Sequence, residues 1–114
     1  MEDCIFCRIV GGEIPAEKVY EDDTIVAFDD ISPQAPVHVL VIPKRHVPTL
    51  NDIEPGDADL MGRLALAAIA VAKEKGLGDR GYRLVTNCLA DAGQAVFHLH
   101  MHLLGGRTMG WPPG

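Results

Sequence analysis

The chain has 114 residues, 47% of them hydrophobic and 23% charged, a composition typical of one small globular domain. Its formal net charge is −6 and it contains no basic run or stripe, which argues against nucleic acid as a partner. The acidic start MEDCIFCRIV is not a secretory signal, and the apolar run LALAAIAVA is too short to span a bilayer, so we expect a cytoplasmic protein with no membrane partner and a single domain over residues 1–114.

The first half of the sequence predicts a short helix followed by three strands. CIFCRIVGG at 4–12 suits a short helix that ends at the glycine pair. KVYEDD at 18–23 and TIVAFDD at 24–30 indicate two strands joined at an acidic turn. VHVLVIP at 37–43 is a continuous apolar, β-branched run and predicts a well-buried strand. Residues 44–55 form a polar stretch that we expect to be a loop.

The second half predicts one long helix and two strands. Apolar residues recur at helical spacing between Asp57 and Lys75, and Gly76 ends the pattern. YRLVTN at 82–87 predicts a strand, residues 88–95 a loop, and VFHLHMHLL at 96–104 the last strand. Strands, one helix and further strands in this order predict an α+β fold with a mostly antiparallel sheet.

One nucleotide-binding pattern does not fit its surroundings. GLGDRG at 76–81 matches G-x-G-x-x-G, which in dinucleotide-binding proteins follows a strand and opens a helix. Here the pattern follows a helix and precedes a strand, so we interpret it as a helix end and a turn.

Histidines alternate with apolar residues in FHLHMH at 97–102. Side chains on a strand alternate between its two faces, so His98, His100 and His102 should share one face. The opposite face should point into the core and carries four apolar side chains: Phe97, Leu99, Met101 and Leu103.

This histidine face has three possible explanations. It could be a plain solvent-facing side of a sheet, although three side chains that titrate near neutrality are an unusual choice for one. It could bind one metal ion, but a straight strand does not readily aim three rings at one point. In the third explanation His100 is a nucleophile or base, and its neighbours orient it, transfer a proton or bind metal.

The third explanation favours chemistry at phosphorus. An imidazole attacks phosphorus well when one nitrogen is bare and the N–H of the other is held by an acceptor such as a backbone carbonyl. The preceding loop DAGQAV contains Gly93 and Ala95, and glycine allows backbone N–H groups to turn toward a bound anion. The cradle and the imidazole would then meet at the same phosphate.

With these residues identified, the sequence resembles the histidine triad family, whose signature H-x-H-x-H is followed by apolar residues, here HLHMHLL at 98–104. It is most similar to the Hint branch, the histidine triad nucleotide-binding proteins, and the similarity extends from CIFCRIV to the terminal WPPG. The resemblance implies a five-stranded antiparallel sheet with one long helix and a short N-terminal helix, paired in a homodimer. It also implies hydrolysis of purine nucleoside phosphoramidates at the P–N bond through a nucleotidyl-histidine, with no organic cofactor.

The resemblance assigns roles to particular residues. His100 would be the nucleophile, and His102 and His38 would support charge and proton transfer. The residues implied in nucleotide binding are Ile5, Phe6, Ile9, Ile14, Phe28, Asp30, Ile31, Leu40, Asn87, Gly93, Gln94, Ala95, His100, His102 and Trp111. Six of these would form an apolar slot for the base: Ile5, Phe6, Ile9, Ile14, Phe28 and Leu40. Four would line the phosphate: Asn87, Gly93, Gln94 and Ala95. Asp30 would accept hydrogen bonds from the ribose, and Trp111 would reach the partner's site. Many Hint proteins carry serine at the position of Ala95, so this chain lacks one potential donor.

A second site is implied at the N-terminus. Cys4 and Cys7 form C-x-x-C, which alone is compatible with a metal site, redox chemistry or two ordinary cysteines. Zinc-containing relatives use two cysteines, the histidine after the central strand and the first histidine of the triad, and this set matches Cys4, Cys7, His46 and His98. Such a closed Cys2His2 site would hold a structural zinc ion. Cys88 has no such partner, and we expect it to be a small buried apolar residue.

Two alternatives to a phosphoramidate hydrolase remain at this level. One is hydrolysis of dinucleoside polyphosphates, as in the Fhit branch of the same family, which the GGR…WPPG tail argues against. The other is a nucleotide-binding regulatory protein with little catalysis. Both alternatives keep a purine nucleotide as the ligand.

Overall fold

The structure is a computed structural model that describes residues 3–114. Its five strands form one antiparallel sheet in the order β1-β2-β3-β5-β4. The elements in chain order are α1 (Ile5–Val10), β1 (Lys18–Glu21), β2 (Ile25–Asp29), β3 (Val37–Pro43), the short 3-10 helices η1 (Leu50–Asp52) and η2 (Pro55–Asp57), α2 (Ala58–Glu74), β4 (Tyr82–Val85), α3 (Leu89–Ala92) and β5 (Met101–Gly105). This confirms the predicted α+β class, the long helix and the short N-terminal helix.

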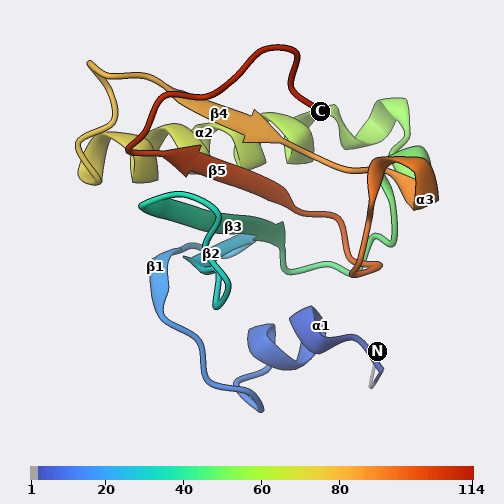
Figure 1. The fold of residues 1–114 in the computed structure, drawn as a ribbon. Coiled ribbons are helices and arrows are strands. Elements are labelled where there is room, and N and C mark those ends of the chain that lie inside the picture. The colour runs from blue at the N-terminus through green and yellow to red at the C-terminus, as the bar shows by residue number, and fades with distance from the viewer. Residues whose placement is uncertain (1–2) are drawn as a thin grey trace.

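The sheet lies between two helical layers, with α1 on one face and α2 on the other (Figure 1). Alternate residues of the central strands supply the two faces, as the two-residue period of a strand requires. Phe28 and Leu40 pack with α1 through Phe6 and Ile9. The intervening residues of the same strands, such as Val39, pack with α2 in the larger core.

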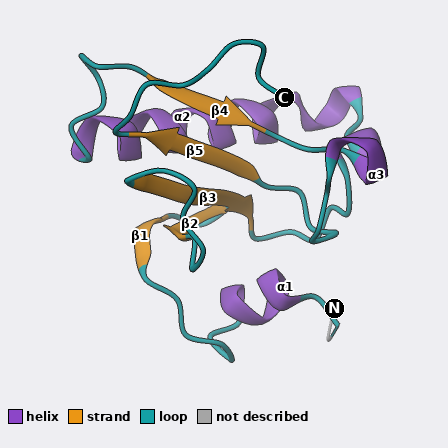
Figure 2. Cartoon of the chain, in the orientation of Figure 1, coloured by secondary structure: helices purple, strands orange, loops and turns teal. Residues whose placement is uncertain are grey.

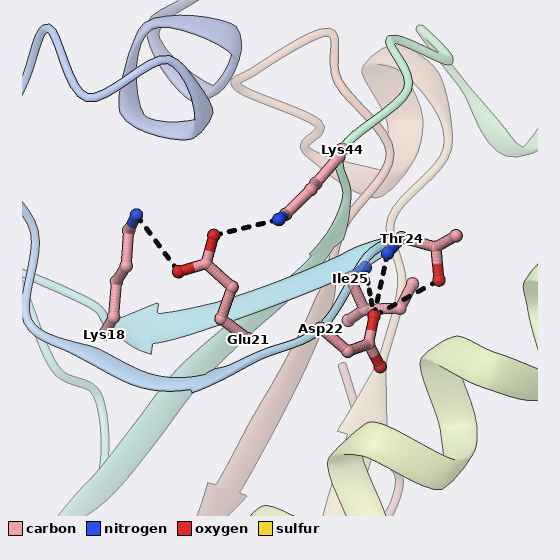
Figure 3. Close-up of polar contacts among 6 residues, drawn as sticks. All are labelled: Lys18, Glu21, Asp22, Thr24, Ile25 and Lys44. Atoms are coloured by element: carbon pink, nitrogen blue, oxygen red, sulfur yellow. Dashed lines mark hydrogen bonds and ion pairs between the residues drawn. The ribbon is translucent and has the colours of Figure 1, made fainter.

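The β1–β2 hairpin turns at Asp22, as the acidic turn predicted (Figure 3). One oxygen of Asp22 accepts hydrogen bonds from the backbone N–H groups of Thr24 and Ile25, both at 2.8 Å. The hydroxyl of Tyr20 donates to the other oxygen at 2.7 Å. These donors, the Tyr20 hydroxyl first, lower the pKa of Asp22 to about 2 because they stabilise the carboxylate. The turn therefore fixes the register of the hairpin that precedes the site.

The long helix α2 lies within one residue of its predicted ends. Pro55 begins the short 3-10 helix that leads into it, and Gly76 follows its last turn with a φ of +76°, a conformation that glycine adopts without strain. Within GLGDRG the N–H of Gly81 donates to the carbonyl of Leu77 at 2.8 Å. The segment is thus a helix end and a turn, as predicted. No helix within residues 3–114 is long and apolar enough to cross a membrane.

The last strand is shorter than predicted, because β5 starts only at Met101, and the segment between α3 and β5 is a loop (Figure 2). Pairing with β3 stops at Val41 opposite Met101, and before that point the backbone turns to a different partner: the N–H of Leu99 donates to the carbonyl of Val47 at 2.6 Å. The expectation that Phe97 faces the core is therefore wrong, and its side chain is 52% exposed.

Four smaller predictions also need correction. β4 ends at Val85, two residues before the predicted strand end. The predicted loop at 88–95 contains the four-residue helix α3, and the polar stretch at 44–55 contains η1 and the start of η2. Cys88 is half-buried rather than buried, because it precedes α3 at the edge of the molecule.

Candidate active site

A cavity of about 620 Å³ opens between α1 and the sheet, a size typical of small-molecule sites. Its wall is mainly apolar and contains all six residues expected to hold a base: Ile5, Phe6, Ile9, Ile14, Phe28 and Leu40. Asp30 and Ile31 line the same cavity, and Ile31 is 98% exposed. The structure thus brings the expected apolar slot and the expected ribose-binding carboxylate together in one hollow.

His100 stands behind this slot with one nitrogen held and the other bare. Its Nδ1–H donates to the carbonyl of His98 at 2.7 Å. In a neutral ring this hydrogen bond leaves Nε2 with a free lone pair. Burial lowers the pKa of His100, which favours the unprotonated ring that a nucleophile needs. Phe6 packs edge-on against this ring with centroids 5.1 Å apart.

A chain of hydrogen bonds defines the tautomers of the two flanking histidines. The backbone N–H of Gln34 donates to Nδ1 of His38 at 3.0 Å. Because Nδ1 of His38 accepts, the ring carries its hydrogen on Nε2, which lies 2.9 Å from Nδ1 of His102. His102 therefore accepts at Nδ1 and, when neutral, carries its own hydrogen on Nε2.

Asp30 links this histidine pair to the cavity. Its Oδ2 lies 3.5 Å from Nε2 of His38, farther than the 2.9 Å to His102, and its Oδ1 accepts from the N–H of Ser32 at 2.7 Å. The side chains of Asp30, His38 and His102 are also close enough together to bind one metal ion. To bind metal through Nε2, a neutral His38 would need its hydrogen on Nδ1, but the N–H of Gln34 points at that nitrogen. The geometry therefore favours a hydrogen-bond chain here.

The charge state of His102 is set mainly by burial. Burial lowers the pKa of His102 to about 4, with His100 and His38 contributing in the same direction and Asp30 opposing them. In the free protein at neutral pH the ring is thus uncharged and holds a single hydrogen. Together with the Gln34–His38 bond, this places a hydrogen-bond donor, not an acceptor, at Nε2 of His102.

Two groups in this arrangement were missed by the sequence analysis. The hydroxyl of Thr86, just after β4, donates to the carbonyl of His100 at 2.9 Å and holds the backbone of the nucleophile candidate. The backbone N–H of Gln34 sets the tautomer of His38. Neither group can be recognised in the sequence, because a threonine hydroxyl and a main-chain N–H acquire these partners only when the chain folds.

A second cluster consists of Cys4, Cys7, His46 and His98, and His98 also presents the carbonyl that accepts from His100. Its potential ligand atoms lie within 4.8 Å of one another. Nδ1 of His98 is 3.3 Å from Sγ of Cys4, and Nδ1 of His46 is 3.2 Å from Sγ of Cys7. Tetrahedral zinc with Zn–S near 2.3 Å and Zn–N near 2.0 Å separates S and N by about 3.5 Å. The cluster of two sulfurs and two nitrogens therefore has the size that a metal such as zinc requires.

The surroundings of His98 also fit a metal ligand. Its Nε2–H donates to the carbonyl of Pro43 at 2.7 Å, which leaves Nδ1 bare and aimed at the two cysteines. The side chain has no exposed surface, and burial lowers its pKa. Burial also raises the pKa of the Cys7 thiol, whereas a bound cation would favour the thiolate.

Several residues expected around the phosphate lie elsewhere or have their polar groups engaged. The side-chain oxygen of Gln94 accepts from the N–H of Leu89, and its amide nitrogen donates to the carbonyls of Pro48 and Val96. The backbone N–H groups of Gly93 and Gln94 donate to carbonyls within the α3 turn, so they do not form the expected anion cradle. Gln94 instead holds the loop in place.

Five further expected residues do not line the 620 Å³ cavity: His100 and His102, described above, and Asn87, Ala95 and Trp111. Ala95 borders an adjoining hollow that also contains Cys4 and His46. Asn87 is half-buried after β4. Trp111, in the C-terminal tail, is 83% exposed.

Comparison with known proteins identifies the family. The profile described as HIT domain matches residues 11–109, most of the chain. The protein therefore belongs to the HIT family, and its similarity to the Hint branch is confirmed.

Individual relatives are similar over nearly their whole length. The chain is 56% identical to an uncharacterised HIT-like protein of Synechocystis, over 99% of this chain and 98% of that one. It is 47% identical to the purine nucleoside phosphoramidase of Escherichia coli, over 96% of this chain and 92% of that one.

The fold agrees with crystal structures of the family. A HIT family hydrolase from Legionella pneumophila superposes with a TM-score of 0.96 at 52% identity, over 98% of this chain and 100% of that one. A histidine triad nucleotide-binding protein from Candida albicans superposes with a TM-score of 0.83 at 34% identity, over 96% of this chain and 83% of that one. The predicted five-stranded α+β architecture is therefore the HIT fold.

Proposed function

We propose that this protein is a nucleotidyl hydrolase that cleaves the P–N bond of purine nucleoside phosphoramidates. The observation that carries the proposal is the His100 ring, whose Nδ1–H is held by the His98 carbonyl at 2.7 Å while Nε2 stays bare. A buried, neutral imidazole in this state is an effective nucleophile. The similarity to the phosphoramidase of Escherichia coli supports the same reaction class.

In the proposed complex the base occupies the apolar slot that contains Phe6 and Phe28, and the ribose hydroxyls donate to Asp30. The free oxygen of Asp30 faces the histidine pair, so the phosphate extends toward His100. Because the N–H groups of Gly93 and Gln94 are engaged, phosphate contacts fall to the backbone around Ala95 and to Nε2–H of His102.

The reaction then proceeds in two displacements. Nε2 of His100 attacks phosphorus, the P–N bond breaks, and the amine leaves with the bonding pair and takes one proton from solvent. Water then attacks the nucleotidyl-histidine, the bond from phosphorus to Nε2 breaks, and water releases one proton. In both steps the N–H of His102 donates to a phosphate oxygen, where negative charge develops.

We also propose that Cys4, Cys7, His46 and His98 hold a structural zinc ion. The support is the S–N spacing and the fixed tautomer of His98. A closed Cys2His2 site supplies folding energy rather than a reactive position. The backbone carbonyl of His98 accepts from Nδ1–H of His100. By restraining His98, the ion would therefore also restrain the orientation of the His100 ring.

We also propose that the protein forms a homodimer, as the family resemblance implies. Exposed apolar side chains near an edge of the sheet support this proposal. β4 is an edge strand, and its Tyr82 and Leu84 are 38% and 37% exposed. Leu66 on α2 is 65% exposed. An edge strand with apolar side chains is a ready template for pairing with a second copy. Sedimentation of wild type and Leu84→Lys tests this, and a monomeric wild type would contradict it.

The function is tested by comparing substrates and variants. Wild type should hydrolyse adenosine 5′-phosphoramidate faster than diadenosine polyphosphates, and rapid quenching should trap a nucleotide on His100. His100→Ala should fold, bind AMP and show neither turnover nor adduct, whereas His102→Ala should react slowly and still form the adduct. Preference for the polyphosphate would favour the Fhit-type reaction, and an inactive wild type without adduct would favour a regulatory nucleotide-binding role.

A further inference from the structure

We propose that Arg107 is a positioning residue that keeps the flanking histidines in their donor tautomers, an inference that rests on the proposed function for its effect on rate. Arg107 follows β5 and does not line the nucleotide cavity. It lies within GGR, a part of the tail that the mechanism above does not use.

The guanidinium of Arg107 clamps the loop before β3. Its Nε and Nη2 both donate to the backbone carbonyl of Gln34, at 3.2 and 3.1 Å. Nη1 donates to the carbonyl of Thr108 at 3.2 Å, which fixes the guanidinium on its own segment. Two N–H groups of one rigid fork on one carbonyl restrain both the position and the direction of that residue.

Gly106 brings the same two segments into close contact. It adopts a φ of +91°, and a Cβ built on it would lie 2.8 Å from Cβ of Pro36. A side chain there would have to displace the proline, since real Cβ atoms essentially never approach so closely. The glycine and the arginine thus hold the loop of residues 31–36 from one side.

Gln34, whose carbonyl accepts from Arg107, also determines the tautomers of His38 and His102. Gln34 accepts from Arg107 through its carbonyl and donates to Nδ1 of His38 through its N–H. If Gln34 moves away, His38 can carry its hydrogen on Nδ1 instead, with Nε2 bare toward His102. His102 would then hold its hydrogen on Nδ1, and its Nε2 could no longer donate to a phosphate. Arg107, on the surface, therefore determines whether Nε2 of His102 can donate a hydrogen bond to a phosphate.

Arg107→Met removes the guanidinium and keeps much of the apolar stem. We expect kcat on adenosine 5′-phosphoramidate to fall about tenfold, the effect of losing charge-assisted hydrogen bonds on one carbonyl, with KM nearly unchanged because the base slot and Asp30 are untouched. Arg107→Lys, which retains one donor, should recover part of the rate. Nitrogen NMR of the ring nitrogens should show His38 as the Nε2–H form in wild type and as a mixture of tautomers in Arg107→Met.

Arg83→Met is the matched control. Arg83 is also an arginine that donates to a carbonyl of the tail, that of Gly110 at 2.8 Å, and it does not contact Gln34. An equal loss of kcat in Arg83→Met, an unchanged kcat in Arg107→Met, or a loss of kcat without a change of the His38 tautomer would each overturn the proposal. The NMR result needs no substrate, so an inactive wild type with the expected tautomer change would reject the proposed function and keep the clamp.

Discussion

Replacing Phe6 tests how the short helix α1 is held on the sheet. α1 has six residues, too few to be stable alone, and its buried residues are Phe6 and Ile9. Phe6 is 6% exposed. Its ring packs edge-on against Phe28, His98 and His100 with centroids 5.5, 5.8 and 5.1 Å apart. We therefore expect Phe6→Ala to loosen both the slot and the nucleophile.

The size of the effect follows from burial. Truncating a buried phenylalanine to alanine costs about 3–5 kcal/mol of unfolding free energy. One side of Phe6 borders the open cavity, so fewer contacts are lost than in a closed core, and we expect about 3 kcal/mol, the lower end of that range. In a domain of this size such a loss lowers Tm by roughly 10 °C.

Urea unfolding of wild type, Phe6→Ala and Phe97→Ala measures this difference. Phe97 has the same side chain one residue before the triad, but it is 52% exposed, so its truncation should cost under about 1 kcal/mol. If Phe6→Ala lost less than about 1 kcal/mol, or Phe97→Ala lost as much as Phe6→Ala, the packing argument would be refuted.

Four other predictions concern single groups. His102 should stay neutral down to pH about 4 in an NMR titration. Since its pKa is lower in the folded than in the unfolded protein, the free energy of unfolding should fall as pH drops from about 6.5 to 4. This decrease should be smaller in His102→Asn. Asp22→Ala should cost about 1–2 kcal/mol at pH 7 by urea unfolding, and Asp22→Asn should cost less because its oxygen still accepts. Because the Asp22 pKa is lowered to about 2, the stabilisation by this carboxylate should be lost progressively as pH falls from about 4 to about 2. Cys7→Ser should abolish stoichiometric zinc measured by metal analysis, and Cys88→Ser should retain it; equal zinc in both would contradict the site. Ala95→Ser should raise kcat/KM on a phosphoramidate by up to about tenfold, and an unchanged value would exclude a role for that hydroxyl.

Much of the architecture could be predicted from local pattern. Helical spacing located α2 to within a residue, and β-branched runs located β2 and β3. These elements could be predicted because the periodicity of apolar residues depends only on residues close together in the sequence. The prediction for the last strand failed because its alternation continues through His98 and His100, whereas pairing with β3 stops at Met101 opposite Val41 and Leu99 bonds to Val47 instead. Alternation predicts which way side chains point, but not whether a partner strand is there.

The residue types of the site were also legible in the chain. The spacing of the histidines and the C-x-x-C pair indicated imidazole chemistry and a possible metal cluster. The family resemblance added Asp30 and His38, and the structure places both beside His102. It also indicated Gly93 and Gln94 among the residues that line the phosphate, and in the structure the backbone N–H groups of both bond to carbonyls within the α3 turn.

What the sequence by itself determined is the set of elements and the kind of chemistry, because side-chain type and periodicity are local properties. Only the tertiary structure decided which nitrogen of each histidine is bare. That choice depends on the His98 carbonyl, the Gln34 N–H and the Pro43 carbonyl, which are main-chain groups present at any residue. The Pro43 carbonyl lies 55 residues from His98 in the sequence. The Gln34 N–H and the His98 carbonyl are near their partners in sequence, but the folded backbone decides where they point, and side-chain pattern does not show that.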